Sequence, residues 1–130
     1  MNLEKVVFGF FVLLALTLNF GFVMGDIDDP NHHHAWELFA ALIVSVIATI
    51  MKFGDRTHIG AVLLATSLVA DLQLLAAAIV WGSGLYVFES ASPEEIASLT
   101  ASVVSLAGGA LLANIASVTL LIVETVTLRR

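Results

Sequence analysis

Four long apolar runs dominate the pattern of hydrophobic and polar positions along the chain. They cover roughly residues 6–24, 35–53, 59–88 and 96–126, and short polar stretches separate them. Each run is long enough to form a helix across a hydrocarbon core of about 30 Å, which takes about 20 residues. The pattern predicts an all-α integral membrane protein, a compact bundle of four transmembrane helices in one transmembrane domain, residues 1–130.

Local signals set the ends of these helices. Ser92-Pro93-Glu94-Glu95 has the sequence of a capping box with proline at the first helical position, so the fourth helix should begin there. Asp29-Pro30 predicts a similar start for the second helix, and Gly54-Asp55 predicts a helix stop followed by a new cap. We therefore expect helices over about residues 5–25, 30–53, 56–88 and 93–127.

The first apolar run also has features of a signal peptide. Lys5 would be its charged start, and Val23-Met24-Gly25 would be a small-residue cleavage site. We interpret the run as a retained transmembrane helix.

Charged residues divide sharply between the two predicted sides of the membrane. Four spans put both termini and the loop near residues 54–58 on one side, and all five basic residues lie there: Lys5, Lys52, Arg56, Arg129 and Arg130. Because basic residues favour the cytoplasmic side, we expect a multi-pass protein of the cell (inner) membrane with cytoplasmic N- and C-termini.

The opposite side receives only acidic residues. We name this set the outer acidic mouth, and it consists of Asp26, Asp28, Asp29, Glu37, Glu89, Glu94 and Glu95. Such a rim would raise the local concentration of cations. A merely solvated loop surface explains the same residues equally well.

Composition excludes several classes of protein. The chain is 59% hydrophobic and 12% charged, far from the values of a soluble domain. It has no cysteine, so disulfides and thiolate metal sites are excluded. Its net charge of -6, with no basic stripe, argues against nucleic-acid binding. An enzyme is disfavoured because no nucleophile-base pair, phosphate-binding loop or HExxH motif is present.

Asp71 is the most informative polar residue within the apolar runs. It lies about 12 residues from the inner end of the third helix, about 18 Å deep and near the membrane midplane. An ionisable side chain at that depth is costly and indicates a functional site. Every basic residue lies at the membrane edge, so a proton, a bound cation or water remains as the partner of Asp71.

Depth along the other helices adds further polar residues near the level of Asp71. On the third helix, Ser67 shares the face of Asp71, and Gln73 lies on another face. The complete predicted polar layer consists of Asp71, Asn19, Asn114, Ser67, Gln73, Ser45 and Thr49. It could form an ion pathway, or it could hold the helices together through hydrogen bonds of about 1 kcal/mol or less each. Since two faces of the third helix are small or polar, we expect a partner subunit to cover part of it.

The fourth helix carries small residues at successive steps of four. They are Ala101, Ser105, Gly109, Ala113 and Ser117. Small residues let helix backbones approach closely in lipid, so this stripe predicts a helix-packing surface within the chain or against a neighbour.

Three consecutive histidines precede the second apolar run. His32, His33 and His34, together with Glu37, offer the nitrogen and oxygen ligands that zinc accepts. If they are helical, His33 and Glu37 at positions i and i+4 form the best pair. Sensing of pH and a simple solvated helix end are the alternatives to a metal site.

Two function classes fit these features. The first is a homo-oligomeric channel or carrier for a monovalent cation or a proton, with Asp71 at the centre of its pathway. The second is a non-conducting accessory or assembly subunit of a larger membrane complex, which packs through the stripe on the fourth helix. The lipid bilayer is a partner in both.

Overall fold

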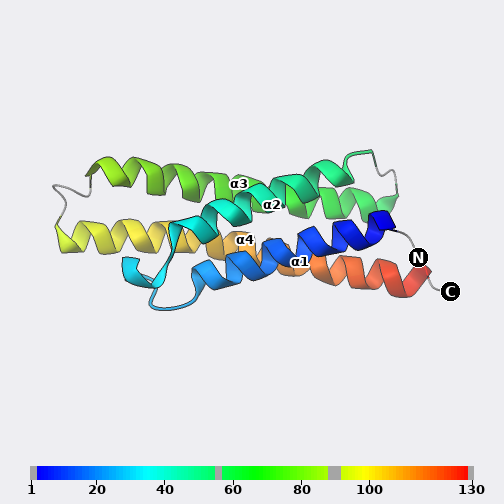
Figure 1. The fold of residues 1–130 in the computed structure, drawn as a ribbon, viewed down its shortest axis with the longest axis horizontal. Coiled ribbons are helices and arrows are strands. Elements are labelled where there is room, and N and C mark those ends of the chain that lie inside the picture. The colour runs from blue at the N-terminus through cyan, green and yellow to red at the C-terminus, as the bar shows by residue number, and fades with distance from the viewer. Residues whose placement is uncertain (1–2, 55–56, 88–91, 129–130) are drawn as a thin grey trace.

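The computed structural model describes residues 3–54, 57–87 and 92–128, and its regular structure there is entirely helical. The elements are α1 (Leu3–Val23), the 3-10 turn η1 (Pro30–His32), α2 (Ala35–Lys52), α3 (His58–Val87) and α4 (Pro93–Leu128). The α-helices run up and down in a bundle. The start of α1, the end of α2, the start of α3 and the end of α4 all lie at one end of the bundle (Figure 1). All four are long and apolar enough to cross a membrane, so the chain has the character of a multi-pass membrane protein.

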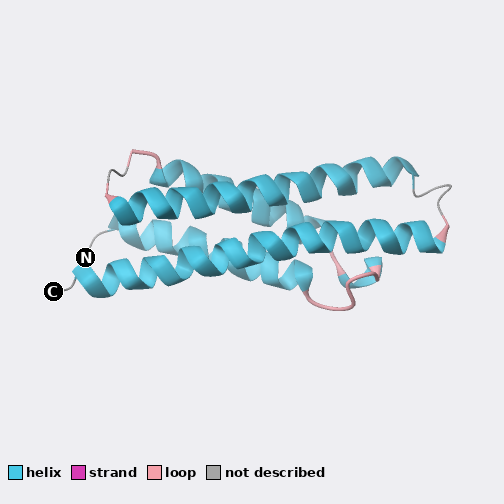
Figure 2. Ribbon diagram, turned by 180° about the vertical axis from the view of Figure 1, so that it is seen from behind, coloured by secondary structure: helices cyan, strands magenta, loops and turns pink. Residues whose placement is uncertain are grey.

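The helices form a ring in which each one packs against two others. Contacts join α1 to α2, α2 to α3 and α3 to α4, and α4 closes the ring against α1. Because α3 has 30 residues and α4 has 36, their hairpin projects beyond the α1–α2 connection, as both views show (Figures 1 and 2). The last turn of α3 and the first turn of α4 therefore lie at a different level along the bundle from the α1–α2 connection.

Buried positions recur at alternating steps of three and four. On α1 the buried residues are Phe8, Val12, Ala15, Asn19 and Phe22. On α4 they include Thr100, Val103, Ala107, Ala110, Asn114 and Ser117. An average step of 3.5 residues is typical of helices that cross at about 20° in four-helix bundles. Large apolar side chains such as Phe10, Ile43, Leu72 and Leu112 are exposed on the outer faces, where lipid would contact them.

Helix caps account for several of the observed boundaries. The Glu95 backbone N–H donates to Ser92 Oγ over 3.2 Å, and α4 begins at Pro93, so the predicted cap at Ser92 and the predicted start of the fourth helix are confirmed. Gly54 has a φ of +94°, the left-handed conformation of a helix stop. Thr57 Oγ1 accepts a hydrogen bond from the Gly60 N–H at 2.9 Å and caps α3. The predicted cap at Asp55 lies outside the described residues.

The predicted start of the second α-helix at Pro30 is wrong. Asp29 Oδ1 accepts from the Asn31 N–H at 2.9 Å, but this cap begins only the single turn η1. His33 and His34 are then extended, and α2 begins at Ala35. The reason is tertiary: the buried ring of His33 contacts the carbonyl oxygens of Phe22 and Asp26 at 2.5 and 2.8 Å, which a continuous helix would not allow.

Candidate functional site

The interior of the bundle contains polar residues between two apolar clusters. The larger cluster includes Phe22, Leu38, Ala41, Ala70, Leu74, Ala77, Trp81, Val103, Ala107 and Ala110. The smaller one, toward the end that carries the termini, consists of Phe8, Val12, Ala48 and Leu63. On two helices a buried polar residue lies between positions that contribute to these clusters: Ser45 on α2 and Ser67 on α3. On α4, the buried Asn114 lies between Ala110 of the larger cluster and Val118, which packs against the smaller one. We call this level the polar break.

Asp71 lies beside the polar break, where α3 faces α2. Its carboxyl oxygens contact two hydroxyl groups of α2: Oδ1 is 2.6 Å from Ser45 Oγ, and Oδ2 is 2.5 Å from Thr49 Oγ1. Thr49 Oγ1 is also 2.9 Å from the carbonyl oxygen of Ser45. Ser45 and Thr49 lie one helical turn apart on α2, so they present both hydroxyls to one carboxyl group. The three residues form what we call the Asp71 cluster.

The depth of the Asp71 cluster makes it unusual. Asp71 lies 13 residues after His58 and 16 before Val87, roughly 20 Å and 24 Å from the two ends of α3. The side chain is half-buried, and the neighbouring Leu68, Leu72 and Leu75 are exposed. The carboxyl group therefore lies at the edge of the α2–α3 contact, near the surface that lipid would cover.

In the described part of the chain, the partners of the Asp71 carboxyl group are two hydroxyl groups, and no lysine or arginine contacts it. The two described lysines, Lys5 and Lys52, lie at the end of the bundle that carries the termini. The sequence analysis predicted a proton, a cation or water as the partner of the carboxyl group. In the structure, Ser45 and Thr49 of the same chain are its hydrogen-bond partners.

The opposite polar face of α3 packs against α4. Thr66 Oγ1 lies 2.7 Å from Ser117 Oγ, within hydrogen-bonding distance. The amide of Gln73 packs against Gly109, where a Cβ atom would collide with Gln73 Oε1. Helices of the same chain thus cover part of both polar faces of α3, and the predicted partner subunit stays a prediction.

The two predicted asparagines occupy different environments. Asn19 Nδ2 donates to the carbonyl oxygen of Ala107 at 3.1 Å and joins α1 to α4 beside the larger apolar cluster. Asn114 is buried in the polar break. Within the described residues, Asn19 Oδ1, Asn114 Nδ2 and Gln73 Oε1 have no hydrogen-bond partner. Buried amide atoms without partners are costly, and they mark where water or an ion would be stabilised.

The step-of-four stripe on α4 does not lie on one packed face. Ser117 is buried against α3, Gly109 contacts Gln73, and Ala101 and Ala113 are half-buried, but Ser105 is exposed. A step of four advances a helical position by 40° each time, so five members turn away from any single neighbour. The buried face follows the alternating steps of three and four described above.

The histidine segment brings together a different set of residues from the one predicted. Ligand atoms of Asp26, Asp29 and His32 lie within 4.8 Å of one another, so His32 alone of the four predicted ligands belongs to this group. Its Nδ1 accepts from the Asp26 backbone N–H at 2.8 Å, so the neutral ring carries its hydrogen on Nε2. Nε2 faces Asp29 Oδ2 at 3.4 Å.

The remaining predicted ligands are separated. Both ring nitrogens of His33 face backbone carbonyl oxygens, His34 is exposed, and the carboxylate of Glu37 packs against Gly21 of α1. The pairing of His33 with Glu37 is therefore wrong, because it assumed that His33 is helical. Zinc binding at this segment stays a prediction, and the group whose ligand atoms converge is Asp26, Asp29 and His32 rather than the predicted set.

The outer acidic mouth is divided between the two outer connections. Asp26 and Asp28 are exposed, and Asp29 and Glu37 half-buried, at the α1–α2 connection. Glu94 and Glu95 are exposed in the first turn of α4, which lies farther out (Figure 1). Glu89 lies outside the described residues. The described carboxylates thus form two groups at different levels.

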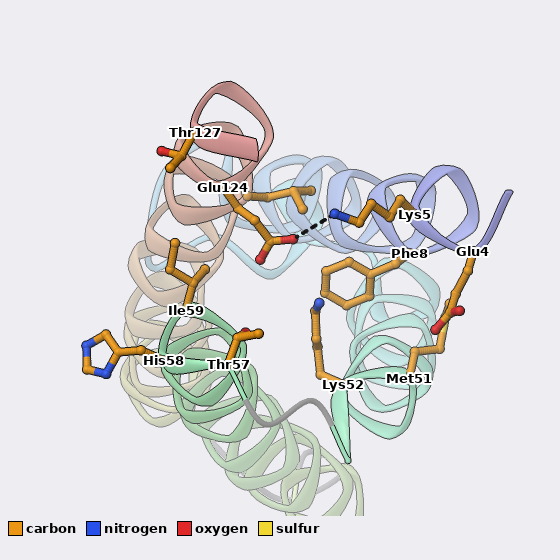
Figure 3. A pocket seen from close by; sticks show the side chains of 11 residues that line it. Glu4, Lys5, Phe8, Met51, Lys52, Thr57, His58, Ile59, Glu124 and Thr127 are labelled. Atoms are coloured by element: carbon orange, nitrogen blue, oxygen red, sulfur yellow. Dashed lines mark ion pairs between the residues drawn. The ribbon is translucent and has the colours of Figure 1, made fainter. Parts of the chain in front are cut away.

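The opposite end of the bundle contains a cavity that the sequence did not suggest. It has a volume of about 500 Å³ and is surrounded by all four helices (Figure 3). Lys5 of α1 pairs with the mostly buried Glu124 of α4 over 3.5 Å, and the Lys52 ammonium lies 4.5 Å from the centre of the Phe8 ring. Glu124 is an acidic residue within the fourth apolar run, and this unusual position was the only feature of the sequence that could have indicated the cavity.

Comparisons with known proteins give a family but no function. A search of curated proteins and a search of solved structures each give no match. The profile of DUF6394, a family of unknown function, matches residues 32–125, more than half of the chain. That range contains α2, α3, most of α4 and the whole Asp71 cluster. The chain therefore belongs to the DUF6394 family.

Proposed function

We propose that this protein conducts or transports a monovalent cation or a proton across the cell (inner) membrane, through a path that passes the Asp71 cluster. The functional unit in this proposal is a homo-oligomer with both termini in the cytoplasm. All five basic residues fall toward one end of the predicted bundle, which supports that orientation, because positive charge is retained on the cytoplasmic side.

The observation that carries the proposal is the position of the Asp71 carboxyl group. It is half-buried, roughly 20 Å from the nearer end of its helix, and no basic side chain among the described residues contacts it. A charge that only stabilised the fold at that depth would need a partner of opposite sign. A carboxyl group that reversibly receives a cation explains the absence of such a partner in this part of the chain.

Neighbouring residues support a hydrated path at this level. The polar break interrupts the apolar interior with Ser45, Ser67 and Asn114. Asn114 Nδ2 has no acceptor among the described residues, so a water molecule or an ion ligand would lower its energy. The half-exposed edge of Asp71 would face a second copy of the chain in the proposed oligomer.

Flux into vesicles tests the proposal. Purified protein in liposomes should pass H⁺, Na⁺ or K⁺ down an imposed gradient faster than protein-free liposomes do. Asp71→Asn should remove this flux, because an amide cannot bind a cation by charge. Glu4→Gln, the same chemical change at an exposed position outside the outer acidic mouth, is the matched control and should retain it. Absence of flux in the wild type, or full flux in Asp71→Asn, would contradict the proposal.

A second candidate function rests on the outer surface of α3 and α4. A shallow groove there is formed by Ala65, Thr66, Val69, Gly109, Leu112 and Ala113, and small residues at its floor would let a partner helix approach closely. In this alternative the chain is a non-conducting accessory subunit. Purification from native membranes in mild detergent distinguishes the two: a stoichiometric membrane protein partner, together with no flux, would favour the accessory role.

A further inference from the structure

The cavity at the end of the bundle that carries the termini contains a mostly buried carboxylate. The Glu124 side chain is only 11% exposed. Its carboxylate points into a space of about 500 Å³, which has room for several water molecules or a small ion (Figure 3). A buried carboxylate is costly unless it has a cationic partner, so Glu124 requires a cation within the cavity.

The chain supplies that cation from the first turn of α1. Lys5 Nζ lies 3.5 Å from Glu124 Oε1, which is longer than the roughly 2.7–2.9 Å of a charge-assisted hydrogen bond. The Lys5 side chain is 52% exposed, so its ammonium group can reach water without any unfolding of α1. Ion pairs with an exposed member contribute little to stability. The lysine can therefore turn outward, whereas the carboxylate stays buried.

A second ammonium group in the cavity belongs to Lys52. It lies 4.5 Å from the centre of the Phe8 ring and points into the same space as Glu124 (Figure 3). Two further titratable residues of the lining, Glu4 and His58, are exposed, and His58 points away from this space. Two ammonium groups and one carboxylate thus face the cavity, so an additional cation would meet repulsion until one ammonium group leaves.

A one-for-one exchange at Glu124 avoids this repulsion. If the ammonium group of Lys5 turns outward and a free monovalent cation takes its place, the net charge within the cavity does not change. A divalent cation in the same place would add one positive charge close to Lys52. The charges that line the cavity therefore favour a monovalent cation.

We propose that Glu124 binds a monovalent cation, and that Lys5 occupies this site with its own ammonium group until it turns outward. Lys5 is then a tethered competitor of the free cation. The role of this site as the cytoplasmic entrance of the path to Asp71 rests on the proposed function, but cation binding at Glu124 does not.

Chemical rescue of Lys5→Ala tests the inference without a gradient. This variant lacks the tethered ammonium group and leaves Glu124 without its partner at 3.5 Å. Its Tm in detergent at low salt should lie below that of the wild type, and methylammonium or K⁺ should raise it by about 3–6 °C. Mg²⁺ at equal ionic strength should raise it less. The wild type and Lys5→Arg, which keep a tethered cation, should respond only weakly.

The matched control is the double variant Lys5→Ala with Glu124→Gln, which also removes the carboxylate that the added cation would bind. Its Tm should not respond to methylammonium, and this separates binding at Glu124 from a general effect of salt. Lys5→Met, which keeps the apolar stem, replaces Lys5→Ala if that variant does not fold. No cation-dependent shift in the Lys5 variants, an equal shift in the double variant, or a larger shift with Mg²⁺ would overturn the inference.

Flux in liposomes then shows whether the site serves the proposed path. Lys5→Ala should raise the initial rate about two- to fivefold, because the tethered competitor is absent. Cation-dependent stability of Lys5→Ala with no flux in any variant would refute the proposed function and leave the site at Glu124 supported. Flux in the wild type with no cation-dependent stability of Lys5→Ala would overturn the site alone.

Discussion

The two polar faces of α3 place similar numbers of polar groups against different partners. Toward α4, Thr66 meets Ser117 and Gln73 packs on Gly109, so every group is neutral and the backbones are close. Toward α2, a carboxyl group meets the hydroxyls of Ser45 and Thr49. The first face contains only neutral groups, whereas the second contains an ionisable side chain. We therefore expect the second face to contribute more to function.

Removal of the two hydroxyl groups on α2 should lower flux more than any change on the α4 face. The double variant Ser45→Ala and Thr49→Val removes both donors to Asp71 and leaves its carboxyl oxygens unsatisfied, at a cost of about 1–3 kcal/mol. Flux in liposomes should fall about tenfold or more.

The matched control for this variant is Ser102→Ala with Thr119→Val. Both of those hydroxyls are exposed and bond only to carbonyl oxygens of α4 itself. If the control lost as much flux as the α2 variant, the special role of the α2 face would be refuted.

Two adjacent glycines test the α4 face. Gly109→Ala would put a methyl group where Gln73 Oε1 lies, but a Cβ at Gly108 meets nothing within 4 Å. We expect Gly109→Ala to be less stable than Gly108→Ala by about 1–3 kcal/mol, the usual cost of overpacking. Thermal unfolding in detergent measures the difference. Equal stabilities would mean that α3 and α4 are not in close contact at this level.

The smallest expected effect belongs to the hydrogen bond between Thr66 and Ser117. A double-mutant cycle with Thr66→Val and Ser117→Ala should give a coupling energy of about 0.6 kcal/mol, and at most about 1.7 kcal/mol. Flux should stay at the wild-type level in all three variants. A large loss of flux would show that the α4 face also takes part in transport, and the contrast between the two faces would disappear.

The sequence predicted the architecture well because transmembrane helices have strong and local signals. Length and hydropathy gave the four helices, and the Ser92 to Glu95 motif gave the start of α4. The start of α2 could not be predicted, since His33 leaves the helix for carbonyl oxygens at the end of α1. That contact joins residues from different elements, and no local pattern contains it.

The sequence could predict which polar residues lie at a similar level along the helices, but not which of their atoms are in contact. Counting residues along each helix put Ser45 and Thr49 near Asp71, but it could not give the rotation of α2 that turns both hydroxyls toward the carboxyl group. The step-of-four stripe on α4 misjudged the packed face for the same reason, because rotation depends on neighbours. The cavity near Glu124 needs all four helices, and the position of Glu124 within an apolar run was its only signal in the sequence.

The most direct test compares Asp71→Asn with Gln73→Leu. These polar residues lie two positions apart on α3 and face α2 and α4 respectively, so the pair separates the two faces within one helix. Initial rates of flux should be measured in liposomes that contain equal amounts of folded protein. We predict that Asp71→Asn lowers the rate to that of protein-free vesicles and that Gln73→Leu keeps most of the wild-type rate. Wild-type flux in Asp71→Asn, or equal loss in both variants, would contradict the account.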